Sequence, residues 1–204
     1  MDNRKLARFC GLFCITGAII AFIWGVLNTF YPNSAFLTTT QDFDVLNTLL
    51  YRIEHLSFAI LVYPALFAGL LGFYFIGAIG RGIIGKILVG LAVIGFILST
   101  LSSLVKVFLL QSEIANRMLE IGFNYILLLV CPILFTAMAL FAGKVKPWKR
   151  FAPIITLGLL IVFTLPAFLI GIRYLPLTMG LALLSWSILG LADYTEKDAE
   201  LLSE

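Results

Sequence analysis

The stretch IGFNYILLLVCPILFTAMALFAG, residues 121–143, contains no charged residue and no histidine. A helix rises about 1.5 Å per residue, so about 20 apolar residues cross the roughly 30 Å hydrocarbon core of a bilayer. The stretch is therefore long enough to span a membrane. Its unbroken run Ile126-Leu127-Leu128-Leu129-Val130 contradicts the polar and apolar alternation of a transmembrane β-strand.

Five further stretches share this lack of charge and are 19 to 25 residues long: 9–30, 56–80, 87–105, 151–172 and 174–192. The chain is 61% hydrophobic and 12% charged, whereas soluble domains are about half apolar and a quarter charged. Too few residues remain between the stretches to build a soluble core. We therefore predict an all-α fold: one domain, residues 1–204, forming a polytopic bundle of six transmembrane helices.

Orientation is predicted from the lysines and arginines, which tend to stay cytoplasmic when they flank a span. One predicted side collects ten of them: Arg4, Lys5, Arg8, Arg81, Lys86, Lys144, Lys146, Lys149, Arg150 and Lys197. The other side has Arg52, Lys106, Arg117 and Arg173. Both termini are thus expected in the cytoplasm, with the chain in the cell (cytoplasmic) membrane. The net charge of +3 follows from this topology and calls for no nucleic-acid partner.

Two outer segments keep a helical pattern and predict amphipathic extensions of the spans. Thr38-Thr39-Thr40-Gln41-Asp42 predicts a helix start, because such side chains accept hydrogen bonds from the first turn. We expect that helix to lie at the outer interface before it turns into the second span. In the second segment, residues 106–120, Glu113, Arg117 and Glu120 share one face that continues to Asn124.

Local patterns within the spans predict how the helices pack and bend. Residues 61–67, LVYPALF, resemble residues 129–135, LVCPILF, with a proline at the same place. This match leaves an internal repeat of helix pairs and a chance likeness both open. Gly17, Ala21 and Gly25 recur every four residues, a spacing that lets helices approach closely. We expect them to pack inside the bundle, with a homodimer face as the alternative.

The charged residues of the outer side form the candidate site, because charges close to lipid usually pair or face a water-filled cavity. The predicted vestibule consists of Arg52, Glu54, His55, Lys106, Arg117, Glu120, Asn124 and Arg173. For Arg52, Glu54 and His55, a solvated cluster at a helix end is the simpler alternative. No catalytic residue, metal ligand set or cofactor is predicted, because hydrolase, phosphate-binding and zinc motifs are all missing from the sequence.

Three short segments carry a family resemblance: residues 4–13, RKLARFCGLF; residues 50–52, LYR; and residues 148–151, WKRF. With their places before the first, second and fifth spans, they resemble a broad prokaryotic family of six-helix integral membrane proteins of unknown function. The resemblance covers the topology along most of the chain. It implies a fold and no activity.

The sequence favours two functional classes that are not enzymatic and ranks an enzyme third. In the first, the protein binds or passes a small solute or lipid through the outer vestibule, with Arg117 and Arg173 attracting an anionic group. In the second, it is a structural or assembly subunit that holds a larger membrane complex together. The expected partners are the lipid bilayer, a small solute or lipid, and other membrane proteins or a second copy of the chain.

Overall fold

A computed structural model describes residues 3–30, 45–109, 113–142, 145–170 and 175–195 of the chain. Within these ranges the structure is helical and contains no strand. The helices are, in order, α1 (Asn3–Phe30), α2 (Val45–Ser57), η1 (Phe58–Val62), α3 (Tyr63–Phe75), α4 (Ile83–Phe108), α5 (Glu113–Leu119), η2 (Glu120–Val130), α6 (Cys131–Ala142), α7 (Pro147–Arg150), α8 (Ala152–Ile170), α9 (Leu175–Leu184) and α10 (Ser187–Tyr194).

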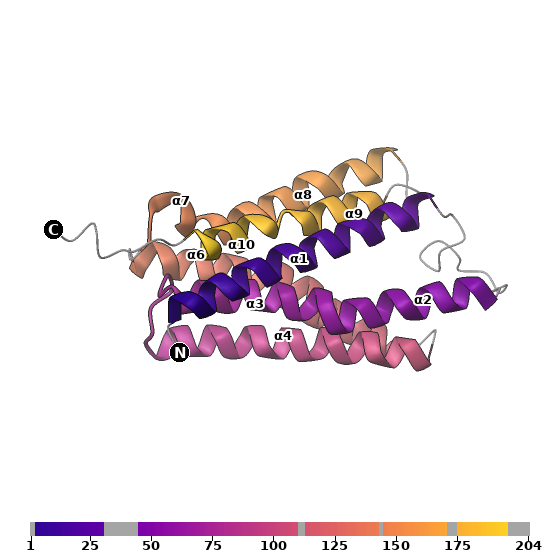
Figure 1. Cartoon of the computed structure of the whole chain (residues 1–204), viewed down its shortest axis with the longest axis horizontal. Helices are drawn as coiled ribbons and strands as arrows, with labels where there is room; N and C mark the ends of the chain where they lie inside the picture. Colours follow the sequence, from indigo (N-terminus) through magenta and orange to yellow (C-terminus); the bar gives the residue numbers. More distant parts are fainter. Residues whose placement is uncertain (1–2, 31–44, 110–112, 143–144, 171–174, 196–204) are drawn as a thin grey trace.

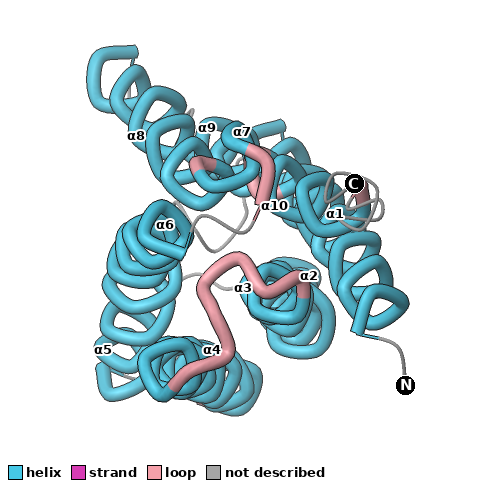
Figure 2. The backbone as a smooth tube through the Cα atoms, turned by 90° about the vertical axis from the view of Figure 1, so that its left-hand side faces the viewer, coloured by secondary structure: helices cyan, strands magenta, loops and turns pink. Residues whose placement is uncertain are grey.

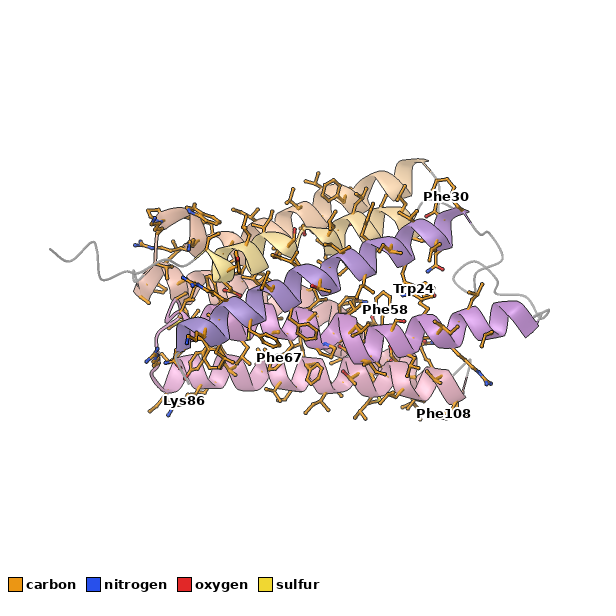
Figure 3. The ribbon with its side chains drawn as sticks, in the orientation of Figure 1. Trp24, Phe30, Phe58, Phe67, Lys86 and Phe108 are labelled. Atoms are coloured by element: carbon orange, nitrogen blue, oxygen red, sulfur yellow. The ribbon has the colours of Figure 1, made fainter. Side chains whose placement is uncertain are left out.

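The long helices run back and forth along one axis (Figure 1). α2, η1 and α3 form one continuous rod, and α5, η2 and α6 form a second. The start of α1 and the end of α10 lie at the end of the bundle that carries Lys86, and Phe30 and Phe108 lie at the other (Figures 1 and 3). We call these the Lys86 end and the Phe30 end.

Among the described residues, five helices are long and apolar enough to cross a membrane: Lys5–Phe30, Leu49–Phe75, Ile83–Phe108, Glu113–Ala142 and Pro176–Tyr194. Ala152–Leu165 of α8 forms a shorter apolar helix. Many large apolar side chains face outward, such as Phe141 at 86% exposure and Phe108 at 78%. The predicted all-α, membrane-type fold is confirmed, together with five of its six spans by length and composition.

α1 lies against α3, α9 and α10 and depends on small residues for these contacts. A Cβ atom added to Gly25 would lie 2.6 Å from the Pro176 carbonyl oxygen and 2.8 Å from Gly180 Cα. A Cβ on Gly11 would overlap the Gly190 carbonyl oxygen. Such distances leave no room for a side chain. The predicted role of Gly25 in packing within the bundle is therefore confirmed.

The second rod packs on α4 through small residues of its own. An added Cβ on Gly122 would lie 2.8 Å from the Gly95 carbonyl oxygen and 2.6 Å from Leu98 Cβ. α6 then contacts α8, so contacts between helices lead from α1 through α3, α4, α6, α8 and α9 back to α1 (Figure 2). Phe73 and Phe135, which are fully buried, fill part of the core between α3 and α6.

Both rods contain a wider π-helical segment that ends two residues before a proline. η1 ends at Val62, before Tyr63-Pro64, and η2 ends at Val130, before Cys131-Pro132. Proline has no backbone N–H and its ring clashes with the carbonyl group four residues earlier. A wider turn relieves that clash without ending the helix. The sequence match between residues 61–67 and 129–135 is thus accompanied by the same local structure.

The predicted outer extensions differ from the structure in how they join the spans. The expected helix start near Asp42 lies outside the described residues. From Val45 onward, α2 runs straight on through η1 into α3 (Figure 1), so an interfacial helix that turns into the membrane is not confirmed. Likewise α5 begins at Glu113 and continues into η2. Helical hydrogen bonding continues across the predicted boundary, since no residue there interrupts it.

Candidate functional site

A carboxylate on α2 is hydrogen-bonded to α1 near the Phe30 end. The Asn28 side-chain nitrogen donates to Glu54 Oε1 at 2.7 Å. Asn28 is 7% exposed and Glu54 is half-buried. A carboxylate with little access to water is costly unless hydrogen bonds or opposite charges stabilise it. Asn28 supplies one such bond from a different helix.

A buried lysine on α4 supplies opposite charge on the other side of α2. Lys106 is 8% exposed and interacts electrostatically with both Glu54 and His55. Among the described residues, no direct ion pair forms between Glu54 and Lys106, although their opposite charges attract each other. Tyr51 packs edge-on against the His55 ring, with the ring centroids 4.2 Å apart. Three helices thus bring their polar groups together around Glu54.

A small cavity opens beside Glu54 between α1, the α2–η1 junction and α9. It has a volume of about 70 Å³ and is lined by Ala21, Trp24, Gly25, Asn28, Glu54, Phe58, Pro176, Met179, Gly180 and Leu183. We call it the Glu54 pocket. Trp24 and Phe58 lie beside each other between α1 and the α2 rod (Figure 3). Its wall is therefore apolar and aromatic, apart from the Asn28 and Glu54 side chains.

Aromatic side chains lie next to the pocket toward the middle of the bundle. The Tyr63 ring packs against Phe58 and Phe123, with centroid distances of 5.6 Å and 5.1 Å. The Ser103 hydroxyl donates to the Tyr63 hydroxyl at 3.4 Å, so α4 also contacts this layer.

The structure brings Glu54, His55 and Lys106 of the predicted vestibule together, and places the others apart. Arg117 is 74% exposed and pairs with Glu113 of its own helix at 2.9 Å. Glu120 is exposed and accepts a hydrogen bond from the Tyr125 hydroxyl at 3.0 Å. Asn124 and Arg52 are exposed, and Arg173 lies outside the described residues. Arg117, Glu120 and Asn124 face outward because α5 and η2 bury Ala115, Gly122 and Phe123 instead.

Two polar residues of the site were missed by sequence reasoning. Asn28 and Tyr63 both lie inside charge-free stretches, and neither continues a face of charged residues as Asn124 does. A signal for Asn28 exists, since a strongly polar amide inside a 22-residue apolar stretch needs a hydrogen-bonding partner. Tyr63 carries no such signal, because tyrosine is common in membrane helices.

The Lys86 end holds two buried charged residues that lie outside the six charge-free stretches of the sequence. Asp193 of α10 is fully buried, and its Oδ2 atom fills the space beside Gly72 of α3 that a side chain would occupy. Lys149 of α7 is 2% exposed. A broad apolar hollow of about 600 Å³ at this end is lined by residues 79–85 and by Met138, Phe141 and Ala142. Its lining offers Arg81 as a charged group but no carboxylate.

Among the described residues, no three histidine, cysteine, aspartate or glutamate side chains lie close enough to hold a metal ion. Within the same described residues, the Glu54 pocket is where a half-buried carboxylate, a hydrogen-bonding amide and a cavity coincide. Comparison of the chain with family models, with curated proteins and with solved structures finds no match.

Proposed function

We propose that this chain is a six-crossing protein of the cell membrane, with both termini in the cytoplasm, that binds a small polar solute or a lipid headgroup in the Glu54 pocket from the outer side. The observation that carries the proposal is the half-buried Glu54 carboxylate, hydrogen-bonded to the buried Asn28 at the edge of a cavity. Polar groups inside an apolar cavity are the usual means by which a binding site fixes its ligand.

The sixth crossing in this proposal is α8. The helix has 19 residues, close to the number that a bilayer requires. It contacts α6 on one side and α9 on the other, and it runs along the same axis as the other long helices (Figure 1). With α8 counted, the crossings are even in number, in agreement with the positions of α1 and α10.

The proposed orientation follows from the distribution of positive charge. The positive residues in the helix ends and turns at the Lys86 end include Lys5, Arg8, Arg81, Lys86, Lys149 and Arg150. Lysine and arginine near spans favour the cytoplasmic side. The Glu54 pocket, near the Phe30 end, would then open toward the outside of the cell.

Cysteine labelling tests the orientation in intact cells. Lys86→Cys and Glu113→Cys place one thiol at each end of the bundle, and the native Cys10, Cys14 and Cys131 are buried. A membrane-impermeant maleimide should label Glu113→Cys in intact cells and Lys86→Cys only after permeabilisation. Labelling of both variants from the same side would contradict the proposed topology.

Ligand binding is tested on the purified protein by thermal unfolding against a panel of small compounds. The panel contains ethanolamine, choline, ethylene glycol, glycerol, glycine, glycolate and inorganic phosphate. At least one compound should raise the unfolding temperature of the wild type and of Glu113→Gln, whose carboxylate is 79% exposed, but not that of Glu54→Gln. A compound that stabilises all three proteins equally binds elsewhere. No stabilisation by any compound would overturn the proposal.

A further inference from the structure

We propose that the Glu54 pocket selects ligands by a positively charged ammonium group, either of a free small amine or of an ethanolamine-type lipid headgroup. This inference rests on the proposed function, because it names the chemical class that the same pocket would take. It reverses the sign expected from the sequence, where Arg117 and Arg173 were assigned to an anion.

The first argument is the charge of the lining. Among the residues that the structure describes, Glu54 is the one charged residue that lines the cavity. Its Oε1 atom accepts the hydrogen bond from Asn28, and from the described residues Oε2 accepts none. An ammonium group carries N–H donors and a full positive charge, and hydrogen bonds between two charged partners are the strongest kind. An anion in the same place would be repelled by the carboxylate.

The second argument is the aromatic wall. Trp24 and Phe58 both line the pocket, and Met179 adds a polarisable thioether. Aromatic rings attract cations, with tryptophan the most effective, and the attraction is larger where water is excluded. A carboxylate combined with aromatic rings therefore favours a cation over a neutral molecule of the same size.

The third argument is size. A volume of about 70 Å³ corresponds to roughly two water molecules at their volume in the liquid. That space suits an ammonium group with one or two carbon atoms, while the remainder of a larger molecule stays outside. Ethanolamine, with four non-hydrogen atoms, is larger than this, so its ammonium end would enter the pocket while its hydroxyl end stays outside.

Lys106 provides an internal check on the sign of the ligand charge. It lies on α4, does not line the pocket, and attracts Glu54. Its charge competes with a bound ammonium group for the same carboxylate. Replacing Lys106 by the uncharged Met should therefore strengthen ammonium binding, whereas it would weaken the binding of an anion.

The test compares ethanolamine with two molecules of nearly the same shape: ethylene glycol, which is neutral, and glycolate, which is an anion. Binding to the purified full chain is followed by isothermal calorimetry and by the unfolding temperature. We expect ethanolamine to bind at least about tenfold more tightly than ethylene glycol, because the charge-assisted bond is lost with the neutral molecule. Glu54→Gln should lose this preference, Lys106→Met should increase it, and Glu113→Gln should leave it unchanged.

A second arm distinguishes a free amine from a lipid headgroup. The protein is placed in nanodiscs of phosphatidylglycerol with or without phosphatidylethanolamine, and unfolding is measured with and without ethanolamine. If the lipid is the ligand, phosphatidylethanolamine raises the unfolding temperature of the wild type but not of Glu54→Gln. If a free amine is the ligand, added ethanolamine raises the unfolding temperature of the wild type, but not of Glu54→Gln, in nanodiscs of phosphatidylglycerol alone.

Glu54→Gln keeps a carbonyl oxygen that can accept the hydrogen bond from Asn28, so a loss of folding is not expected. Its unfolding temperature without ligand checks this, and Lys106→Met gives a gain that misfolding cannot produce. Equal binding of ethanolamine and ethylene glycol at the Glu54 pocket would overturn the ammonium proposal but leave the proposed function standing. Tighter binding of glycolate would overturn it as well.

Discussion

The rods α2–η1–α3 and α5–η2–α6 share one design but place their polar residues in opposite ways. Each begins with a helix rich in polar side chains, widens into a π-helical segment, and continues past a proline. In the first rod, Glu54 and His55 lie next to α1 and α4 and close to Lys106. In the second, Glu113, Arg117 and Glu120 face outward. Equivalent polar patterns can therefore place charged residues against neighbouring helices in one rod and leave them exposed in the other.

The difference lies in which side chains each rod buries against its neighbours. Near the Phe30 end, a hydrogen bond from the Asn28 side chain to Glu54 joins the first rod to α1. The second is joined by the Ser102 hydroxyl, which donates to the Ala115 carbonyl oxygen at 2.5 Å, and by the glycine contact at Gly122. A small residue at the contact lets the backbones of the second rod and α4 approach closely. The polar residues of that rod then lie on the face away from α4.

The largest effect should come from Glu54→Ala. This change removes the acceptor for Asn28 and the negative charge that attracts the buried Lys106. We expect the free energy of unfolding to fall by about 2 kcal/mol. Glu120→Ala in the other rod should change it by no more than about 0.5 kcal/mol, as for other exposed sites. Unfolding in mixed detergent micelles with increasing SDS measures both, and equal effects would abolish the contrast between the rods.

The next largest effect should come from Gly122→Ala. The added methyl group meets the backbone of α4 at Gly95 and Ser99. The two helices η2 and α4 must then move apart. Overpacking of this kind costs about 1.5 kcal/mol. Gly90→Ala on the same helix pair is the control, because nothing lies within 4 Å of its Cβ position, and the change should be neutral or slightly stabilising. Equal unfolding midpoints for the two variants would show that the rod does not depend on close backbone contact.

A smaller effect is expected for Ser102→Ala, which removes the bond to Ala115. The cost should be about 1 kcal/mol, the usual net value of a buried hydrogen bond. Ser57→Ala provides the comparison, since its hydroxyl bonds within its own helix to the Ile53 carbonyl oxygen at 2.7 Å. A larger loss of stability for Ser57→Ala than for Ser102→Ala would mean that the bond between α4 and α5 contributes little.

The smallest effect is expected for Glu113→Ala, which breaks the exposed ion pair with Arg117. Pairs of this kind at a spacing of four residues contribute about 0.3 kcal/mol in water, and salt weakens them. The unfolding midpoint should shift slightly at low ionic strength and hardly at all at high ionic strength. A large shift that persists in salt would instead indicate that α5 makes a buried charged contact.

The helices could be predicted from the sequence because charge is excluded from lipid over lengths that match the bilayer. The site could be predicted only in part. Glu54, His55 and Lys106 were found by their charge, but helical spacing does not reveal which face of a rod meets its neighbours. That choice depends on residues far apart in sequence, such as Gly95 and Gly122. Asp193 illustrates the same limit, since its burial depends on the space left by Gly72.

The π-helical segment η1 also changes which side of the rod the residues before it face. An α-helix turns by about 100° per residue, and a single π-turn holds one residue more than an α-turn. Compared with a rod that is α-helical throughout, the residues before Phe58 are therefore rotated about the helix axis by about 100° relative to α3. Glu54 reaches Asn28 in this rotated frame. The alignment of the carboxylate with α1 thus depends on how many residues η1 contains as much as on their types. Removing one residue within η1 would disturb this alignment without removing any polar side chain.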